Sequence, residues 1–148
     1  MTFFDAGTVK LTTSTWPQCG RAVAKLFALP ISGAKPCLSD WDNRSLYIRS
    51  FYVDQRDMFA SALRVTGTKE SDWTITHDTA KGRYERGVKM FQEGNMMGFG
   101  LLLYSRVFFP EGDAQFDDKV QNAVLGLLEE DLDEGTKGAY EIAIRDGC

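Results

Sequence analysis

Residues 49–76, RSFYVDQRDMFASALRVTGTKESDWTIT, contain a strand, a capped helix and a second strand, and they decide the expected fold. The strand is predicted over 45–53, where side chains alternate between two faces and aromatic and β-branched residues are enriched. Asp54 is a typical N-cap, and Gly67 can end the following helix in a left-handed conformation. The stretch therefore indicates strands that alternate with helices.

The same alternation continues towards the N-terminus. A short β-prone run over 9–13 precedes Thr15, a candidate N-cap, and Pro17 fits the first turn of a helix that reaches about Ala28. Apolar residues recur in this helix at i, i+4, i+7 and i+8, which predicts one buried stripe. The stripe consists of Cys19, Val23, Leu26 and Phe27.

Towards the C-terminus the pattern becomes helical. A strand over 73–76 is followed by a helix that Asp78 or Thr79 caps and Gly94 ends. Residues 96–109, MMGFGLLLYSRVFF, are apolar almost all round, so we expect a helix buried on several sides. Two more helices are predicted, one marked by Phe116, Val120, Ala123, Val124 and Leu127, the other by Ala139, Ile142 and Ala143.

The order of these elements predicts the fold class. We expect an α/β protein tending to α+β, with a small parallel or mixed sheet of about three strands and a C-terminal cluster of helices. A chain of 148 residues has the length of one domain, with a β-α-β-α-β part over 1–78 and a helical part over 79–148.

Composition excludes several classes of function. A net charge of -4 and the lack of a basic run argue against nucleic-acid binding. No stretch approaches 18 consecutive apolar residues, and the N-terminus does not read as a secretory signal, so we expect a cytoplasmic protein without membrane attachment. Three widely spaced cysteines and the lack of clustered ligands argue against a metal site.

Five segments keep an order and spacing that resembles the C-terminal half of NmrA-like and isoflavone-reductase-like oxidoreductases of the fungal type. They are CGRAVAKLFALP (19–30), RSFYVDQRDMFASALRVTG (49–67), ESDWTIT (70–76), AKGRYERGVKMFQEGNMMGFGLLLYSRVFFPEGD (80–113) and EEDLDEGTKGAYEIA (129–143). The resemblance implies a relative of proteins that bind NAD(P) and either reduce small aromatic metabolites or sense redox state.

The cofactor-binding half of that family has no counterpart in this chain. A dinucleotide site needs a G-x-G-x-x-G turn between a strand and a helix. The dense glycine cluster here, Gly94, Gly98 and Gly100, follows a helix and has the wrong order. We therefore expect no NAD(P) binding by this chain alone, and no other cofactor is indicated.

Three polar residues are the candidate catalytic groups. His77, the only histidine, follows a predicted strand end and could act as an acid or base, although a structural hydrogen bond explains it more simply. Tyr104 and Arg106 lie in an otherwise apolar helix and could donate to a substrate oxygen and hold a carboxylate. The simpler alternatives are a core tyrosine and an intramolecular ion pair.

Five apolar residues of the same segment could line a pocket for a flat ligand. Their alternative, which we favour, is a place in the core or in a subunit interface. They are Met96, Met97, Phe99, Phe108 and Phe109.

Functions of different classes remain open at this level. The leading hypothesis is cofactor-independent chemistry of the isomerase, cyclase or dehydratase type on an aromatic or polyketide-like metabolite of secondary metabolism. An alternative is a non-catalytic binding or regulatory module, with a full-length NmrA-like protein as a candidate partner. A third is a remnant of an NAD(P)-dependent reductase. Because the apolar surface exceeds what 148 residues easily cover, we also expect a homodimer.

Overall fold

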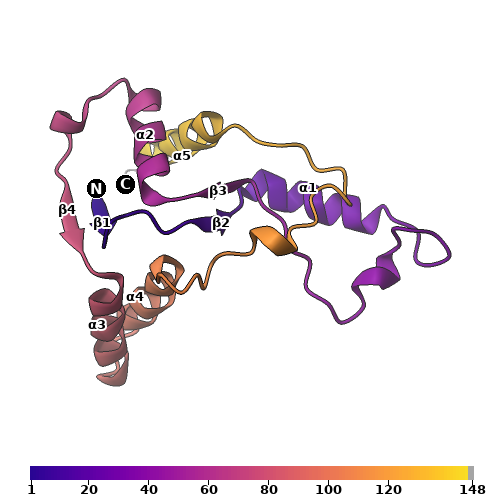
Figure 1. Ribbon diagram of the computed structural model, residues 1–148, viewed down its shortest axis with the longest axis horizontal. Coiled ribbons are helices and arrows are strands. Elements are labelled where there is room, and N and C mark those ends of the chain that lie inside the picture. Colours follow the sequence, from indigo (N-terminus) through magenta and orange to yellow (C-terminus); the bar gives the residue numbers. More distant parts are fainter. Residues whose placement is uncertain (147–148) are drawn as a thin grey trace.

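The computed structural model describes residues 1–146 and contains two separate sheets of two strands each (Figure 1). β1 (Thr2–Phe4) pairs in parallel with β4 (Thr76–Asp78). β2 (Leu11–Thr13) pairs antiparallel with β3 (Phe51–Val53). The mixed α/β class is confirmed. The prediction of one sheet of about three strands is wrong.

The backbone between β1 and β2 explains why the sheets are separate. Asp5 has a φ of 52° and Gly7 a φ of 69°, so the chain turns sharply before β2 begins. A Cβ at Gly7 would lie 2.6 Å from the Phe3 ring, which makes glycine the residue that fits there. Because of this turn, β1 and β2 do not lie in one sheet, and β1 pairs with β4 whereas β2 pairs with β3.

The strand predicted over 45–53 is confirmed only at its end. Residues 45–49 run beside the segment around Gln121, and the Gln121 amide donates to the Tyr47 carbonyl at 2.9 Å. Pairing with β2 begins at Ser50, whose amide donates to the Thr13 carbonyl at 2.8 Å. The Asn122 side chain bonds both backbone groups of Arg49. These partners lie far along the chain, so alternation alone could not identify them.

The three helices predicted from capping residues are confirmed. They are α1 (Trp16–Phe27) after Thr15, α2 (Gln55–Thr66) after Asp54, and α3 (Ala80–Gln92) after Thr79. In each case the cap side chain accepts a backbone N–H of the first turn. Gly67 ends α2 with a φ of 66°, as its sequence position predicts.

The remaining helices, α4 (Met97–Ser105) and α5 (Leu132–Asp146), do not form one C-terminal cluster. Figure 1 shows α4 packed against α3 as a hairpin, whereas α5 lies beside α2 on the other side of the strands. The α3–α4 contact is close because Gly87 and Gly98 face each other across it. The predicted cluster is therefore divided, because α5 packs on α2 of the N-terminal part and not on α3 and α4.

The amphipathic helix predicted from Phe116 to Leu127 does not form. The segment contains a single 3₁₀ turn at Asp117–Lys119, followed by extended and turn backbone. The Asn122 side chain forms its hydrogen bonds with the backbone of the distant residue Arg49. Gly126 has a φ of 58°, a left-handed conformation that interrupts a helix. Hydrogen bonds to distant parts of the chain thus prevent the helix that the spacing of apolar residues predicts.

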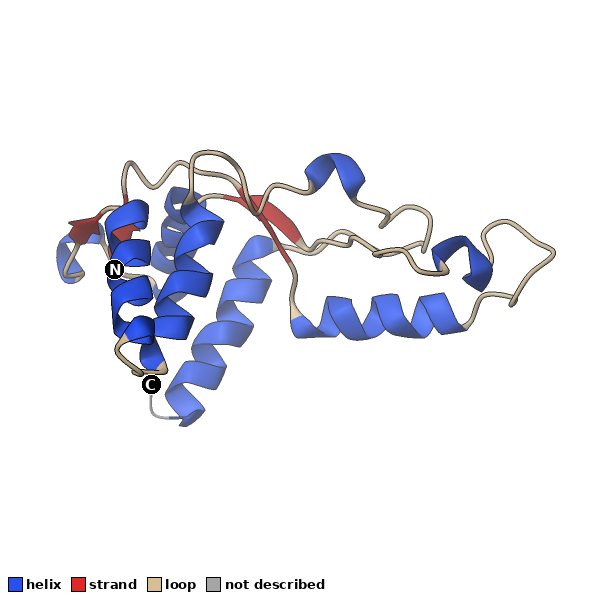
Figure 2. Ribbon diagram, turned by 90° about the horizontal axis from the view of Figure 1, so that it is seen from below, coloured by secondary structure: helices blue, strands red, loops and turns tan. Residues whose placement is uncertain are grey.

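Two predictions of burial are also wrong. Of the helix expected over 96–109, only 97–105 is α-helical, and Met97 and Leu103 are exposed because α3 covers one side only. The stripe on α1 points outwards as well, with Val23 and Phe27 exposed. Figure 2 shows α1 and its following loop extending to one side, away from the other helices. Within residues 1–146, no helix has both the length and the apolarity to cross a bilayer.

Candidate functional site

A pocket of about 710 Å³ opens between the first turn of α1 and one face of α5. Trp16 and Pro17 form one wall, and Gly138, Ala139 and Ile142 form the opposite wall, so the surface is mainly apolar. Figure 2 shows the two helices diverging at this place. The volume falls within the roughly 300–1,000 Å³ that is typical of small-molecule pockets.

Small residues on α5 create the space. Gly135, Gly138, Ala139 and Ile142 recur at i, i+3, i+4 and i+7 and therefore share one face of the helix. A Cβ at Gly135 would lie 2.9 Å from the Phe51 ring, so α5 approaches β3 here only because this residue has no side chain. A Cβ at Gly138 would meet no heavy atom within 4 Å, so this position opens into the pocket.

The Glu130 carboxylate at the pocket floor is held by three donors. Thr15 Oγ1 donates to it at 2.8 Å, and Ser50 Oγ and the Arg21 guanidinium donate as well. Partial burial by itself would raise the pKa of Glu130, but the Ser50, Thr15 and Arg21 donors lower this pKa below its ordinary value. Glu130 is therefore an ionised acceptor that fastens its segment to α1 and β3.

The next carboxylate, Asp131, has a structural role as well. Its Oδ1 accepts the backbone N–H groups of Asp133 at 2.9 Å and Glu134 at 3.0 Å, which caps the start of α5. Glu134 is exposed at the rim of the pocket. Two of the three carboxylates that line the pocket thus maintain its shape.

The outer side of α5 is anchored to α2 by Asp133. Arg64 donates two hydrogen bonds to this carboxylate, from Nε at 2.7 Å and from Nη2 at 2.6 Å. Ser61, which is fully buried, donates to Asp133 Oδ1 at 2.6 Å. The Arg64 guanidinium and then the Ser61 hydroxyl lower the pKa of Asp133 to about 2. This contact positions the α5 wall of the pocket.

The Asp133 contact predicts a loss of stability in acid. Because the folded-state pKa is about 2 and the ordinary value is 3.8, ionised Asp133 stabilises the fold above pH 4. That contribution is lost as the pH falls through about 2. We expect the difference in urea midpoint between the wild type and Asp133→Asn to shrink steadily from pH 5 to pH 2. A difference that stays constant over this range would contradict the assignment.

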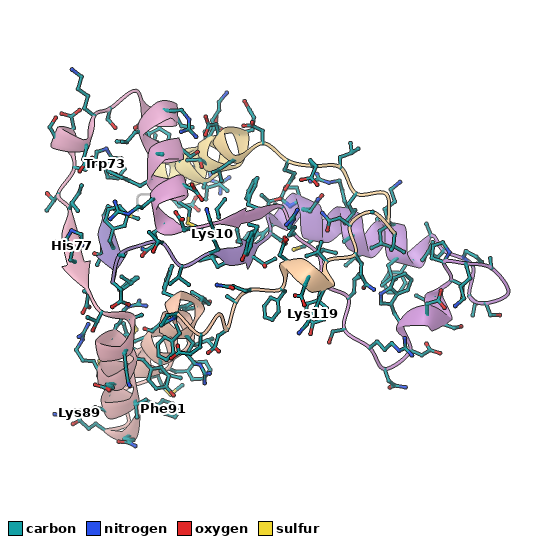
Figure 3. All side chains as sticks on the ribbon, in the orientation of Figure 1. Lys10, Trp73, His77, Lys89, Phe91 and Lys119 are labelled. Atoms are coloured by element: carbon teal, nitrogen blue, oxygen red, sulfur yellow. The ribbon has the colours of Figure 1, made fainter. Side chains whose placement is uncertain are left out.

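The predicted catalytic residue His77 lies on β4, away from this pocket. Its ring stacks on Phe3 with a centroid distance of 5.9 Å, and Phe3 in turn packs on Phe59 of α2. Phe108 packs instead on Phe4, at 4.9 Å. Since successive strand residues face opposite sides, His77 and Phe108 lie on opposite faces of the β1–β4 sheet. Figure 3 also shows His77 far from Phe91 on the hairpin.

The other two predicted catalytic residues, Tyr104 and Arg106, lie at the end of α4 and just beyond it. The Tyr104 side chain is exposed, and the Arg106 guanidinium pairs with Asp113, with Nε to Oδ2 at 2.6 Å. The intramolecular ion pair, the simpler alternative for Arg106, is therefore present. Neither residue lines the α1–α5 pocket. A catalytic role for either stays a prediction.

The five predicted ligand-binding residues do not converge on one site. Met96, Met97 and Phe99 are exposed on the α3–α4 hairpin, with the Phe99 ring 5.9 Å from that of Phe91. Phe109 packs edge-on against Tyr84. Together with Phe108 on Phe4, they are absent from the lining of the α1–α5 pocket.

Sequence reasoning missed the pocket residues because the two walls come from opposite ends of the chain. Trp16 beside Pro17 reads as an ordinary helix start, and Gly138 and Ala139 read as part of an apolar face. The useful signal was the pair of glycines three residues apart in an otherwise regular helix, since glycine costs helix stability unless space or close packing requires it.

Comparisons with known proteins do not assign a family. No protein-family model matches the chain, and neither the search of curated proteins nor that of solved structures gave a match.

Proposed function

We propose that the protein binds a small, flat, apolar molecule in the α1–α5 pocket. The observation that carries this proposal is a mainly apolar space of about 710 Å³ with an indole at its rim. The Trp16 side chain is 88% exposed, so its ring is free to stack on a ligand. Gly138 and Ala139 leave room for a planar group on the opposite wall.

Binding is better supported than catalysis. Glu130 and Asp131 already accept hydrogen bonds from the protein. The Ser14 and Thr15 hydroxyls, which also line the pocket, donate to the Ile48 carbonyl and to Glu130. A general acid or base must reach the reacting proton, and most of the polar side chains that line the pocket are thus engaged in holding the structure. A non-catalytic binding module, one of the alternatives from the sequence, therefore becomes the leading proposal.

The class of ligand follows from two independent sources. The pocket walls favour a planar apolar molecule, and the resemblance to NmrA-like proteins suggests an aromatic or polyketide-like metabolite. We propose thermal-shift measurements with 2-naphthol, a flavone and an anthraquinone, and with NADPH as a separate arm. A ligand that binds the folded state raises the melting temperature. Stabilisation by the flat aromatics is expected, and stabilisation by NADPH alone would contradict the proposed ligand class.

A matched pair of glycine variants locates the binding site. Gly138→Leu fills the pocket, whereas Gly100→Leu adds the same side chain to α4, where a Cβ also meets nothing within 4 Å. We expect the dissociation constant of the best aromatic ligand to rise by at least about tenfold in Gly138→Leu, because its space is occupied. Gly100→Leu should bind like the wild type.

Isothermal titration checks this prediction, and circular dichroism verifies that both variants fold. Replacing a helical glycine with leucine favours the helix itself, so misfolding is not the expected outcome. Equal affinities for Gly138→Leu and the wild type would place the ligand elsewhere and overturn the proposed site.

A further inference from the structure

Helix α1 turns its most apolar face to solvent. Trp16 is 88%, Val23 51% and Phe27 70% exposed, although their spacing of seven and then four residues places them on one ridge. The side that packs on the protein carries Gln18 and Ala22 instead. We call the ridge formed by Trp16, Val23 and Phe27 the α1 stripe. Large apolar surfaces of this kind mark interaction sites.

The surface area of the whole chain indicates how much such an interface could cover. The accessible surface is 9738 Å² for a mass of 16.6 kDa. Folded monomers of this mass expose about 7,600 Å², so the chain exposes about 2,100 Å² more than a typical monomer. The excess is spread over the whole chain, and the stripe supplies part of it. If two copies each covered half of the excess, the pair would bury about 2,100 Å², which is enough for a stable homodimer.

We propose that two copies of the protein pair through the α1 stripe across a two-fold axis. A two-fold axis places the same surface on both sides, so a charged ridge would repel itself, whereas this one carries no charge. Arg21 and Lys25 lie away from the stripe on the helical wheel, and Arg21 is engaged by Gln18 and Glu130 of its own chain.

The geometry of the stripe suits antiparallel pairing of α1 with α1. A two-fold axis near the middle of the helix sets Trp16 of one copy opposite Phe27 of the other. Val23 then faces the region of Gly20, where a Cβ would meet nothing within 4 Å, so the two helices can approach closely. In an antiparallel pair, the partly positive N-terminus of each helix lies beside the partly negative C-terminus of the other, which is favourable. Pairing of this kind requires no ligand. Trp16 belongs both to the stripe and to the lining of the pocket, so the pairing and the proposed ligand share this side chain.

Sedimentation velocity at about 10 μM tests the pairing, with one variant in the stripe and one in the exposed apolar surface of α4. Val23→Glu places a charge in the stripe, and Leu103→Glu places one on α4, where the wild-type side chain is similarly exposed, 48% against 51% for Val23. We expect a dimeric wild type, a monomeric Val23→Glu and a dimeric Leu103→Glu. A dimer that only Leu103→Glu dissociates would move the interface to α4 and overturn the proposal.

Mixing two charged variants distinguishes self-pairing from any other role of the stripe. Val23→Glu and Val23→Lys should each be monomeric because like charges meet across the axis. An equimolar mixture should recover a dimer, since the two opposite charges then lie close together. No recovery in the mixture, or a monomeric wild type, overturns the proposal and leaves the stripe to a different partner.

Discussion

Replacing Gly98 with alanine is expected to destabilise the protein by about 3 kcal/mol, because the new methyl group has no space between α4 and α3. A Cβ at this position would lie 2.5 Å from the Gly87 carbonyl oxygen and 2.5 Å from the Phe91 amide nitrogen. Both are backbone atoms, so no side chain can rotate away to relieve the clash. The two helices must separate or bend, which removes the contact that holds the hairpin together.

Urea denaturation measures this loss, and amide hydrogen exchange over residues 80–105 shows whether the hairpin opens separately from the rest. Gly100→Ala is the matched control in the same helix. A Cβ there meets nothing within 4 Å, so this variant should be as stable as the wild type or up to about 1 kcal/mol more stable. If both alanine variants behaved alike, the close helix contact would not contribute as described.

The second large effect is expected at Asn122, whose side chain replaces a strand partner for Arg49. Its Oδ1 accepts the Arg49 N–H at 3.0 Å, and its Nδ2 donates to the Arg49 carbonyl at 2.7 Å. Because Asn122 is buried, Asn122→Ala leaves the Arg49 N–H without this partner and the Arg49 carbonyl with only the longer hydrogen bond from Gln18 Nε2, at 3.4 Å. An unsatisfied backbone group costs about 1–3 kcal/mol, so we expect a loss of about 2 kcal/mol in urea denaturation.

Asn122→Asp separates the two hydrogen bonds without changing the shape of the side chain. The carboxylate can still accept from the Arg49 N–H, but it has no donor for the Arg49 carbonyl and places a negative charge beside it. We therefore expect Asn122→Asp to be destabilised as well. Wild-type stability in this variant would show that only the acceptor matters, which contradicts a role for both bonds.

Local chemistry made the helices predictable. Asp54 and Gly67 set the ends of α2 through side-chain acceptance at the start and left-handed backbone at the end. Thr15 and Thr79 act in the same way for α1 and α3. These interactions involve neighbours within three residues, so the linear sequence contains all the information they need.

Long-range pairing was not predictable in the same way. The parallel partner of β1 lies more than 70 residues away in β4, and the segment after Phe116 gives up its helical period to bond distant backbone groups. The candidate site depends on the same kind of contact, because Trp16 and Gly138 meet only after α1 and α5 have been placed by Glu130 and Asp133.

The sequence by itself determined the mixed class, the first three helices with their caps, and which residues of α1 are apolar. The resemblance to the C-terminal half of NmrA-like oxidoreductases, and an enzymatic use of His77, Tyr104 and Arg106, stay predictions. Only the tertiary structure decided the strand partners, the pocket and the direction in which the α1 stripe points. The physical reason is that periodicity defines an apolar face, whereas burial of that face depends on which distant surface comes to cover it.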